Sequence, residues 1–263
     1  MEKLVRTSRD GDLTGNYTGE RPADADALEL LVSKLEEDIV LGRLHPRERL
    51  IEDEIMARFG AKRHVVRNGL DRLERMGIVE RVPNRGAHVR VYGAAEIEQL
   101  YVLRNLLETH AARLIPLPLL ASDVADLKRV QATHDEAVDA HDLGRVFHTN
   151  VLFHRTLFTK TGNPYLVSAI NDFALRTHGI RFYCLSFPGY LAAARREHWE
   201  MIRAIETCQR KTLVALCRRH LLASRECYER AAGIKGAPRR AAAAAEPASP
   251  SLLAASSSSG SRP

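Results

Sequence analysis

The chain has 263 residues, 45% of them hydrophobic and 27% charged, with a formal net charge of +6 and a pI near 9.3. This length supports two modest domains, each with its own core. The chain has no apolar run of about 18 residues and no apolar segment near its start, so we expect a soluble cytoplasmic protein without a membrane span or secretory signal.

Three helices are predicted in the first third of the chain. Residues 1–23 lack apolar periodicity and are expected to form a flexible arm. Leucines and isoleucines recur at helical spacing over 28–39, and Gly42 ends that helix. A short helix over 52–59 and a basic helix over 63–76 follow, each closed by a glycine.

The basic helix has two distinct faces. Val66, Leu70 and Leu73 repeat at three- and four-residue steps and predict a core face, whereas Arg63 and Arg67 share another face. Between residues 58 and 90, nine Lys or Arg stand against three Asp or Glu. A phosphate backbone would attract that excess of positive charge.

A hairpin follows the basic helix. Residues 78–82 and 87–91 alternate like strands, and Pro83-Asn84-Arg85-Gly86 supplies the turn. Helix, basic helix and hairpin in this order indicate a winged helix-turn-helix domain, expected over residues 24–92. Such a domain places a helix in the major groove of DNA.

Beyond Gly93 the pattern is helical only, which predicts an all-α antiparallel six-helix bundle over residues 93–235 and a mainly α protein. In the first of these helices, leucines at 100, 103, 107 and 114 form one apolar stripe. Residues 236–263 are rich in Ala, Ser and Pro and are expected to be a disordered tail. The six helices are predicted over 96–115, 122–140, 142–161, 165–185, 190–207 and 211–232.

All four cysteines lie in the C-terminal third, at 184, 208, 217 and 227, without a CxxC pair. This arrangement favours buried reduced thiols over a disulfide framework.

With these residues in place, the chain resembles the GntR family of bacterial transcription factors, and within it the FadR-like branch with an FCD ligand-binding domain. The resemblance implies a homodimeric regulator of double-stranded operator DNA. In this family the recognition helix usually opens Ser-Arg-Thr-Pro and continues Val-Arg-Glu-Ala-Leu. Here Lys62, Asn68 and Gly69 replace the Ser, Glu and Ala, so we expect a different operator. The resemblance is carried by residues 42–52, Arg63 and Arg67, residues 70–79, Pro83–Gly86, Leu103–Glu108, Phe153–Arg155 and Gly162–Pro164.

Arg63 and Arg67 are expected to read base edges, because a guanidinium can bond both O6 and N7 of guanine. The alternative is that both arginines hold only phosphates. Lys62, His64 and Arg72 are expected to contact either the DNA backbone or solvent. Arg49 is a candidate phosphate contact, and the alternative is an ordinary surface arginine.

The wing residues Asn84, Arg85 and Gly86 suit a minor-groove contact. Arginine favours a narrow groove and glycine permits close approach. The alternative is a solvated turn.

In the helical domain, Asn150 and His154 lie four residues apart on one helix face, and His198 and His220 lie on two later helices. The FCD domain binds a metal through an Asp or Asn and three His from three helices, so the resemblance implies a divalent metal at these four residues, zinc or nickel first. Asn150 stands where many relatives have Asp, which predicts weaker binding. Taken singly, each histidine would be an ordinary buried one. Cys217, one turn before His220, is either a substitute ligand or a buried thiol.

Arg104 is a candidate anchor for a small organic acid, because its planar fork fits a carboxylate. The alternative is an ion pair with Glu108, four residues later. Arg181 is a second candidate.

The leading hypothesis is a repressor in which a carboxylate, bound at the metal, favours one conformation of the bundle and changes the placing of the DNA heads. The alternatives are a metal-dependent enzyme with an accessory nucleic-acid-binding head, and an architectural DNA-binding protein without an effector. The chain has no HExxH motif and no carboxylate at motif spacing for a general base, which speaks against the enzyme.

Overall fold

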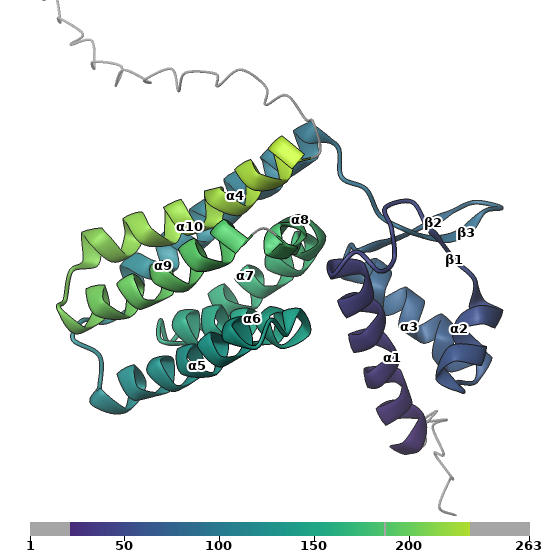
Figure 1. The fold of residues 1–263 in the computed structure, drawn as a ribbon, viewed down its shortest axis with the longest axis horizontal. Helices are drawn as coiled ribbons and strands as arrows, with labels where there is room; N and C mark the ends of the chain where they lie inside the picture. Colours follow the sequence, from purple (N-terminus) through teal and green to yellow (C-terminus); the bar gives the residue numbers. More distant parts are fainter. Residues whose placement is uncertain (1–21, 187, 232–263) are drawn as a thin grey trace, which may run out of the picture.

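The computed structural model describes residues 22–186 and 188–231 (Figure 1). Helices dominate, and the predicted mainly α fold with a small β wing is confirmed. Figure 1 shows a head made of helices and a small sheet beside an all-helical domain. The elements are α1 (Pro22–Val40), β1 (Arg49–Leu50), α2 (Glu52–Phe59), α3 (Arg63–Arg75), β2 (Val79–Val82), β3 (Gly86–Val89), α4 (Ala94–Leu114), α5 (Ala121–Asp139), α6 (Leu143–Thr159), α7 (Pro164–Arg176), α8 (His178–Phe182), a 3₁₀ turn η1 (Tyr183–Ser186), α9 (Pro188–Glu206) and α10 (Arg210–Ala231).

The head is built on the contact between α1 and α3. The predicted core face of α3 is confirmed, since Val66, Leu70 and Leu73 are almost completely buried. A Cβ at Gly69 would lie only 2.4 Å from Cδ2 of Leu31 on α1, so glycine lets the two helices approach closely. This close packing explains why α3 carries a glycine here, although glycine costs about 1 kcal/mol in helix propensity.

Helix α1 begins at Pro22, six residues before the predicted start. Residues 22 and 23, expected in the flexible arm, therefore belong to this helix, while the rest of the arm and the predicted Ala/Ser/Pro tail lie outside the described residues.

The wing is a three-stranded antiparallel sheet with the order β1-β3-β2. The predicted hairpin is β2 and β3, with Val79 opposite Val89 and Val82 opposite Gly86. Strand β1, which the sequence did not predict, pairs Leu50 with Ala87. Two residues are too few to show alternation, so only the tertiary contact with β3 identifies this strand.

The helical domain is centred on Phe153, Leu157, Met201, Ile202 and Leu213, which have 0–1% exposure. The prediction of a single helix over 165–185 was wrong. In its place are α7, α8 and η1, so the described part of this domain has seven α-helices. The break falls at Thr177, whose hydroxyl accepts a hydrogen bond from Arg104 on α4. Gly179 lies two residues later, but a single glycine within a helical pattern is too weak a signal to place a break.

The buried face of α4 also differs from the prediction. Leu114 is 45% exposed, and the leucines at 100, 103 and 107 are only partly buried. The positions that face the bundle interior include Tyr101, Arg104 and Glu108 instead. This polar face directs an arginine into the centre of the domain.

The expectation of four reduced cysteines was wrong. Cys184 in η1 and Cys227 on α10 form a disulfide with a Cα–Cα separation of 6.3 Å, while Cys208 and Cys217 are free. The two partners are 43 residues apart in the chain, and only the packing of η1 against α10 brings them together.

The head and the helical domain touch through α1, which lies beside α8 (Figure 1). Val40 at the end of α1 shares a hydrophobic cluster with Ala137, Val146 and Phe147 of the helical domain. His178 on α8 pairs with Glu36 on α1, with 2.7 Å between Nδ1 and Oε1. Among the described residues, no helix is both long and apolar enough to span a bilayer.

Candidate functional site

Two sites emerge, one on the head and one inside the helical domain. On the head, α3 presents Arg63 and Arg67 with 52% and 57% of their side chains exposed. Both are paired with the first turn of α2. Arg63 bonds Asp53 at 2.8 Å, and Nε of Arg67 lies 3.1 Å from an oxygen of Glu52. The predicted base readers thus share one exposed face, and acidic neighbours hold them in the unbound head.

The start of α3 shows the same arrangement. Lys62 caps the helix without a side-chain hydrogen bond, which agrees with the loss of the family's serine. Its ammonium lies 2.9 Å from Asp24 on α1, and Nε2 of His64 lies 3.5 Å from the same carboxylate. Burial would raise the pKa of Asp24, but the hydrogen bond from Lys62 outweighs it, and the pKa is lowered.

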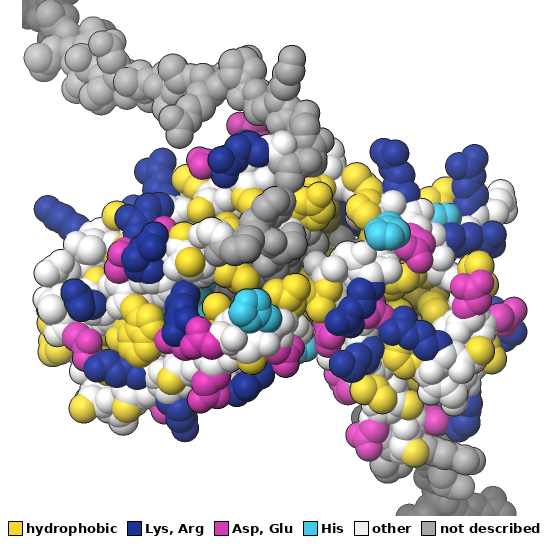
Figure 2. Space-filling model, viewed as in Figure 1, with side chains coloured by type: hydrophobic (Ala, Val, Ile, Leu, Met, Phe, Trp, Pro, Cys, Tyr) yellow, Lys and Arg dark blue, Asp and Glu magenta, His cyan; other side chains and the backbone are white. Residues whose placement is uncertain are grey.

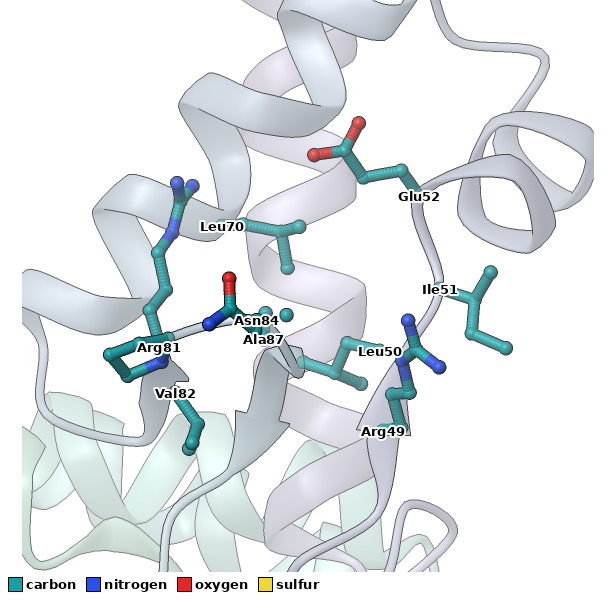
Figure 3. Close-up of a pocket in the computed structure, with 11 residues that line it drawn as sticks. Arg49, Leu50, Ile51, Glu52, Leu70, Arg81, Val82, Asn84 and Ala87 are labelled. Atoms are coloured by element: carbon teal, nitrogen blue, oxygen red, sulfur yellow. The ribbon is translucent and has the colours of Figure 1, made fainter.

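The wing places its three predicted residues in an exposed turn. Asn84 and Gly86 have positive φ angles of 62° and 84°, which Asn and Gly adopt readily. Between the wing and the start of α2 lies a pocket of about 510 Å³. Figure 3 shows Arg49 and Glu52 on one side of this pocket and Arg81 and Asn84 on the other.

Positive charge on this face is interleaved with negative charge. Figure 2 shows dark blue Lys and Arg side chains on the head beside magenta acidic ones. On the face predicted to bind DNA, Asp24, Glu52 and Asp53 form ion pairs with the arginine, lysine and histidine side chains. These acidic residues were not predicted to lie on that face. The first three residues of α2 are all acidic, which was a readable signal for Glu52 and Asp53.

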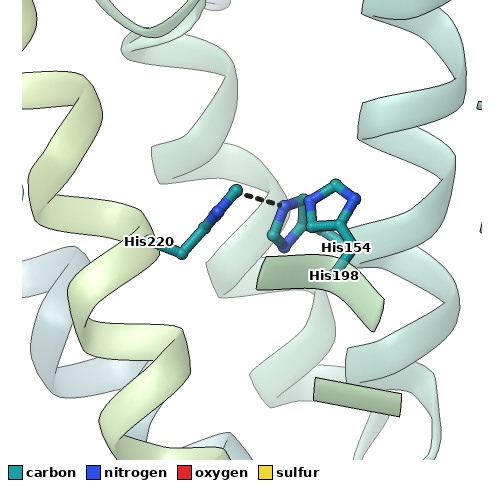
Figure 4. A group of neighbouring side chains, drawn as sticks. All are labelled: His154, His198 and His220. Carbon is teal, nitrogen blue, oxygen red and sulfur yellow. Dashed lines mark hydrogen bonds between the residues drawn. The ribbon is translucent and has the colours of Figure 1, made fainter. Parts of the chain in front are cut away.

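Inside the helical domain, three histidines from three helices converge (Figure 4). His154 comes from α6, His198 from α9 and His220 from α10. All three are buried, and each offers a ring nitrogen within 4.8 Å of those of the other two. Nε2 of His154 lies 3.2 Å from Nε2 of His220.

Hydrogen bonds fix the orientation of two of these rings. Gln131 donates from Nε2 to Asp135, so its oxygen faces Nδ1 of His198 at 2.8 Å and accepts from it. Nδ1 of His220 donates to Glu197 at 2.9 Å. Both histidines therefore direct an unprotonated Nε2 into the site, as metal-binding histidines do when the other nitrogen is held.

Burial keeps the cluster neutral. It lowers the pKa of His154, His198 and His220, and the neighbouring charge of Arg181 adds to the effect. A neutral imidazole is the metal-binding form. Nε2 of His198 is buried and has no hydrogen-bond partner among the described residues. An unpaired buried acceptor is costly, and a metal ion would satisfy it.

The three histidines fit a metal ion on this evidence. Zinc–nitrogen bonds of about 2.0–2.1 Å place tetrahedral ligands about 3.4 Å apart, so the cluster needs only a small contraction. Cys217, the alternative ligand, is a buried thiol whose pKa burial raises above its ordinary value, and it does not belong to the cluster.

Asn150 lies on the same buried face of α6 as His154, as predicted, and is hydrogen-bonded within the chain. It lies on α6 one turn before His154, and its oxygen accepts a hydrogen bond of 2.8 Å from Arg181 of α8. The same guanidinium lies 3.5 Å from Nε2 of His220. A cation of the chain itself thus lies between Asn150 and His220, at the edge of the histidine cluster.

Beside this cluster lies a cavity of about 190 Å³ lined by Arg104, Arg181, Glu108, His154 and His178, among others. Arg104 is 2% exposed and forms the alternative ion pair with Glu108, with Nη2 and Oε1 2.6 Å apart. It also donates to Thr177 at 2.7 Å. Burial first, and then the nearby Arg104, lower the pKa of Arg181.

The sequence missed several residues of this site. His134 packs against His198 with ring centroids 5.3 Å apart, and burial lowers its pKa to about 4. Gln131 and Glu197 orient the rings, and Thr177 holds Arg104. Gln131 and His134 are three residues apart on a helix with buried neighbours, which is too weak a pattern to assign a role.

Comparison with known proteins adds two family matches. Residues 29–89 match the profile described as bacterial regulatory proteins, gntR family, and residues 99–223 match the profile of the FCD domain.

Several characterised proteins are similar in sequence. The HTH-type transcriptional regulator McbR of Escherichia coli K12 is 24% identical over 142 residues, covering 54% of this chain and 64% of its own length. The Nta operon transcriptional regulator of Aminobacter aminovorans is 29% identical over 137 residues, covering 52% and 63%. The HTH-type transcriptional repressor RspR of E. coli K12 is 22% identical over 172 residues, covering 65% and 75%. The chain thus spans just under two thirds of the length of the first two.

Solved structures show the same fold. E. coli McbR/YncC aligns with a TM-score of 0.68 and 18% identity over 78% of this chain and 98% of that one. A putative GntR regulator from Rhodococcus sp. RHA1 aligns with a TM-score of 0.66 and 20% identity over 78% and 99%.

Proposed function

Because the chain belongs to the gntR family of bacterial regulatory proteins and carries an FCD domain, we propose that it is a repressor whose grip on operator DNA is released by a small organic acid. The family is one of transcriptional regulators, so the chain is a regulator and not an enzyme. A relative named as a repressor supports the direction of control. The proposed place of action is the bacterial cytoplasm, at the DNA.

The cavity beside the histidine cluster is the observation that carries effector control. It brings two buried guanidinium groups, Arg104 and Arg181, to one space, and Glu108 is the only carboxylate among the described residues that line it. This excess of positive charge favours an anion. Its volume of about 190 Å³ is below the range of about 300–1,000 Å³ usual for drug-sized ligands, which favours a small acid.

We further propose that His154, His198 and His220 hold a divalent metal, zinc or nickel. Their neutral state, the held Nδ1 atoms and the unpaired Nε2 of His198 support this assignment. A bound metal would supply a Lewis-acid position for a carboxylate oxygen.

Helix α8 offers a route from the cavity to the head. Arg181 and His178 both line the cavity, and His178 also pairs with Glu36 on α1. An acid that pairs with Arg181 favours a particular position of α8 and hence of α1. Effector binding then shifts the population between head placements.

Double-stranded operator DNA would be bound by a homodimer, with one head in each half-site and half-sites about one helical turn apart. Changed head spacing then weakens binding at both half-sites together.

The test combines metal, acid and operator. An operator is first selected from random duplexes, and its affinity is measured by fluorescence anisotropy with Zn²⁺ or Ni²⁺ and with acetate, lactate, malonate or succinate. The proposal expects one acid to weaken operator binding at least tenfold and to raise the melting temperature. His198→Ala is expected to remove the metal-dependent part of this effect, while Arg129→Gln, at an exposed arginine of α5 outside the cavity, is the control. Operator binding that no acid alters would indicate an architectural DNA binder instead.

A further inference from the structure

The position of Arg181 bears directly on the proposed metal site, on which this inference rests. The Asn150 oxygen, the fourth ligand expected from the sequence, accepts the Arg181 hydrogen bond at 2.8 Å. The guanidinium also lies 3.5 Å from Nε2 of His220, the nitrogen left for a metal because Nδ1 donates to Glu197. Arg181 therefore touches two of the four expected ligands.

Electrostatics makes this contact unfavourable for a metal. A guanidinium stays positively charged at every relevant pH, and a divalent ion beside it would be repelled in a buried site of low dielectric constant. A carboxylate at position 150 would attract both cations and offset the repulsion. The neutral amide of Asn150 provides an oxygen but no charge.

We propose that Arg181 competes with the metal for the oxygen of Asn150 and thereby sets a low metal affinity. In the conformation described, the histidines alone are available to a metal, and Asn150 becomes a ligand only when Arg181 withdraws into the cavity beside it. An anion paired with Arg181 in that cavity would favour the withdrawn position. The amide at 150 and the arginine at 181 thus act as a pair that makes metal affinity depend on the position of α8.

The experiment measures Zn²⁺ affinity of the metal-free full-length protein by competition with a chromophoric chelator, with Zn²⁺ as the only added ligand. Arg181→Gln is expected to bind Zn²⁺ about tenfold more tightly than the wild type, because it removes the positive charge and replaces the guanidinium that donates to Asn150 with a shorter, neutral amide. Arg129→Gln makes the same charge change at an exposed position of α5 outside the cavity and is expected to leave the affinity within threefold. A gain below threefold for Arg181→Gln overturns the proposal.

A second variant keeps the arginine and covers the case in which Arg181→Gln does not fold. Asn150→Ala is expected to lose no more than threefold in Zn²⁺ affinity, since in the wild type Arg181 already occupies that oxygen. A larger loss would show that Asn150 ligates with Arg181 in place, which overturns the proposal. In the double variant, the gain from Arg181→Gln is expected to shrink, as competition for one atom requires.

The outcomes separate this inference from the metal site itself. If the wild type binds zinc, His198→Ala abolishes this binding and Arg181→Gln gives no gain in affinity, then the metal site is supported and the competition by Arg181 is refuted. If none of the wild type, Arg181→Gln and Asn150→Ala binds zinc, both the metal site and the competition by Arg181 are refuted.

Discussion

Replacement of Arg67 by alanine tests the proposed reading of DNA most directly. The side chain is 57% exposed, and its ion pair is with Glu52 at 3.1 Å. Such a half-exposed pair contributes about 0–1 kcal/mol, so Arg67→Ala is expected to lower the free energy of unfolding by less than about 1 kcal/mol. The fold should remain intact.

The effect on DNA is expected to be much larger. One bidentate arginine–guanine contact discriminates against a wrong base by about 1–3 kcal/mol. A dimer on two half-sites loses two such contacts, about 2–6 kcal/mol, which is about 30-fold or more in affinity and would abolish the preference for the operator. Binding to random duplex should change far less, because it depends mainly on phosphate contacts.

The assay is anisotropy titration of the selected operator and of a scrambled duplex, at three salt concentrations. Arg75→Ala, in the last turn of the same helix, is the matched control, because Arg75 is exposed and is not expected to reach a base. Equal losses on operator and scrambled DNA, with a salt slope reduced by about one, would assign Arg67 to a phosphate. Unchanged operator affinity would refute any role in recognition.

Three further predictions concern charge, pH and backbone conformation. Glu52→Gln is expected to raise DNA affinity about two- to fivefold, because it removes the carboxylate that pairs with Arg63 and Arg67 in the unbound head. The same anisotropy titration measures this affinity, and weaker binding would contradict the prediction. Burial lowers the pKa of His134 from 6.5 to about 4, so between these pH values the unfolded chain binds a proton that the folded protein does not. The stability that the neutral His134 contributes to the metal-free protein should therefore be fully present above pH 6.5 and be lost as the pH decreases toward 4, by on the order of 3 kcal/mol. Urea titrations should show a shallower fall of the free energy of unfolding in His134→Gln. Gly77 has a φ of +76°, and a Cβ there would lie 2.9 Å from Oη of Tyr92, so Gly77→Ala is expected to destabilise the protein by about 1–2 kcal/mol in urea titrations. Gly189 in α9 has no positive φ and open space for a Cβ, so Gly189→Ala should not destabilise the protein, and equal effects of the two variants would count against backbone strain.

The head was largely predictable because its information is local. The core face of α3 depends on apolar spacing within one helix, and the wing turn depends on residues that favour positive φ, such as Asn84 and Gly86. The family resemblance then identified the domain. What remained hidden was β1, because a two-residue strand exists only through its pairing with β3.

In the helical domain, the three histidines were predictable as a set, but their surroundings were not. Spacing along the chain placed His154, His198 and His220 on separate helices, and the family resemblance suggested that they meet. The break at Thr177 is accompanied only by the isolated Gly179, yet it produces α8 and turns Arg181 toward Asn150. The Cys184–Cys227 disulfide likewise depends on how η1 packs on α10.

The sequence by itself determined the kind of protein: two domains, a basic recognition helix with a wing, and a helical bundle with a histidine set. Periodicity and turn chemistry encode these features, since each depends on residues within a few positions of one another. Only the tertiary structure decided which polar side chains of different helices meet, placing Glu52 on Arg67 and Arg181 on Asn150. Coulomb and hydrogen-bond energies depend on distances of a few ångströms between helices, and the sequence does not state those distances.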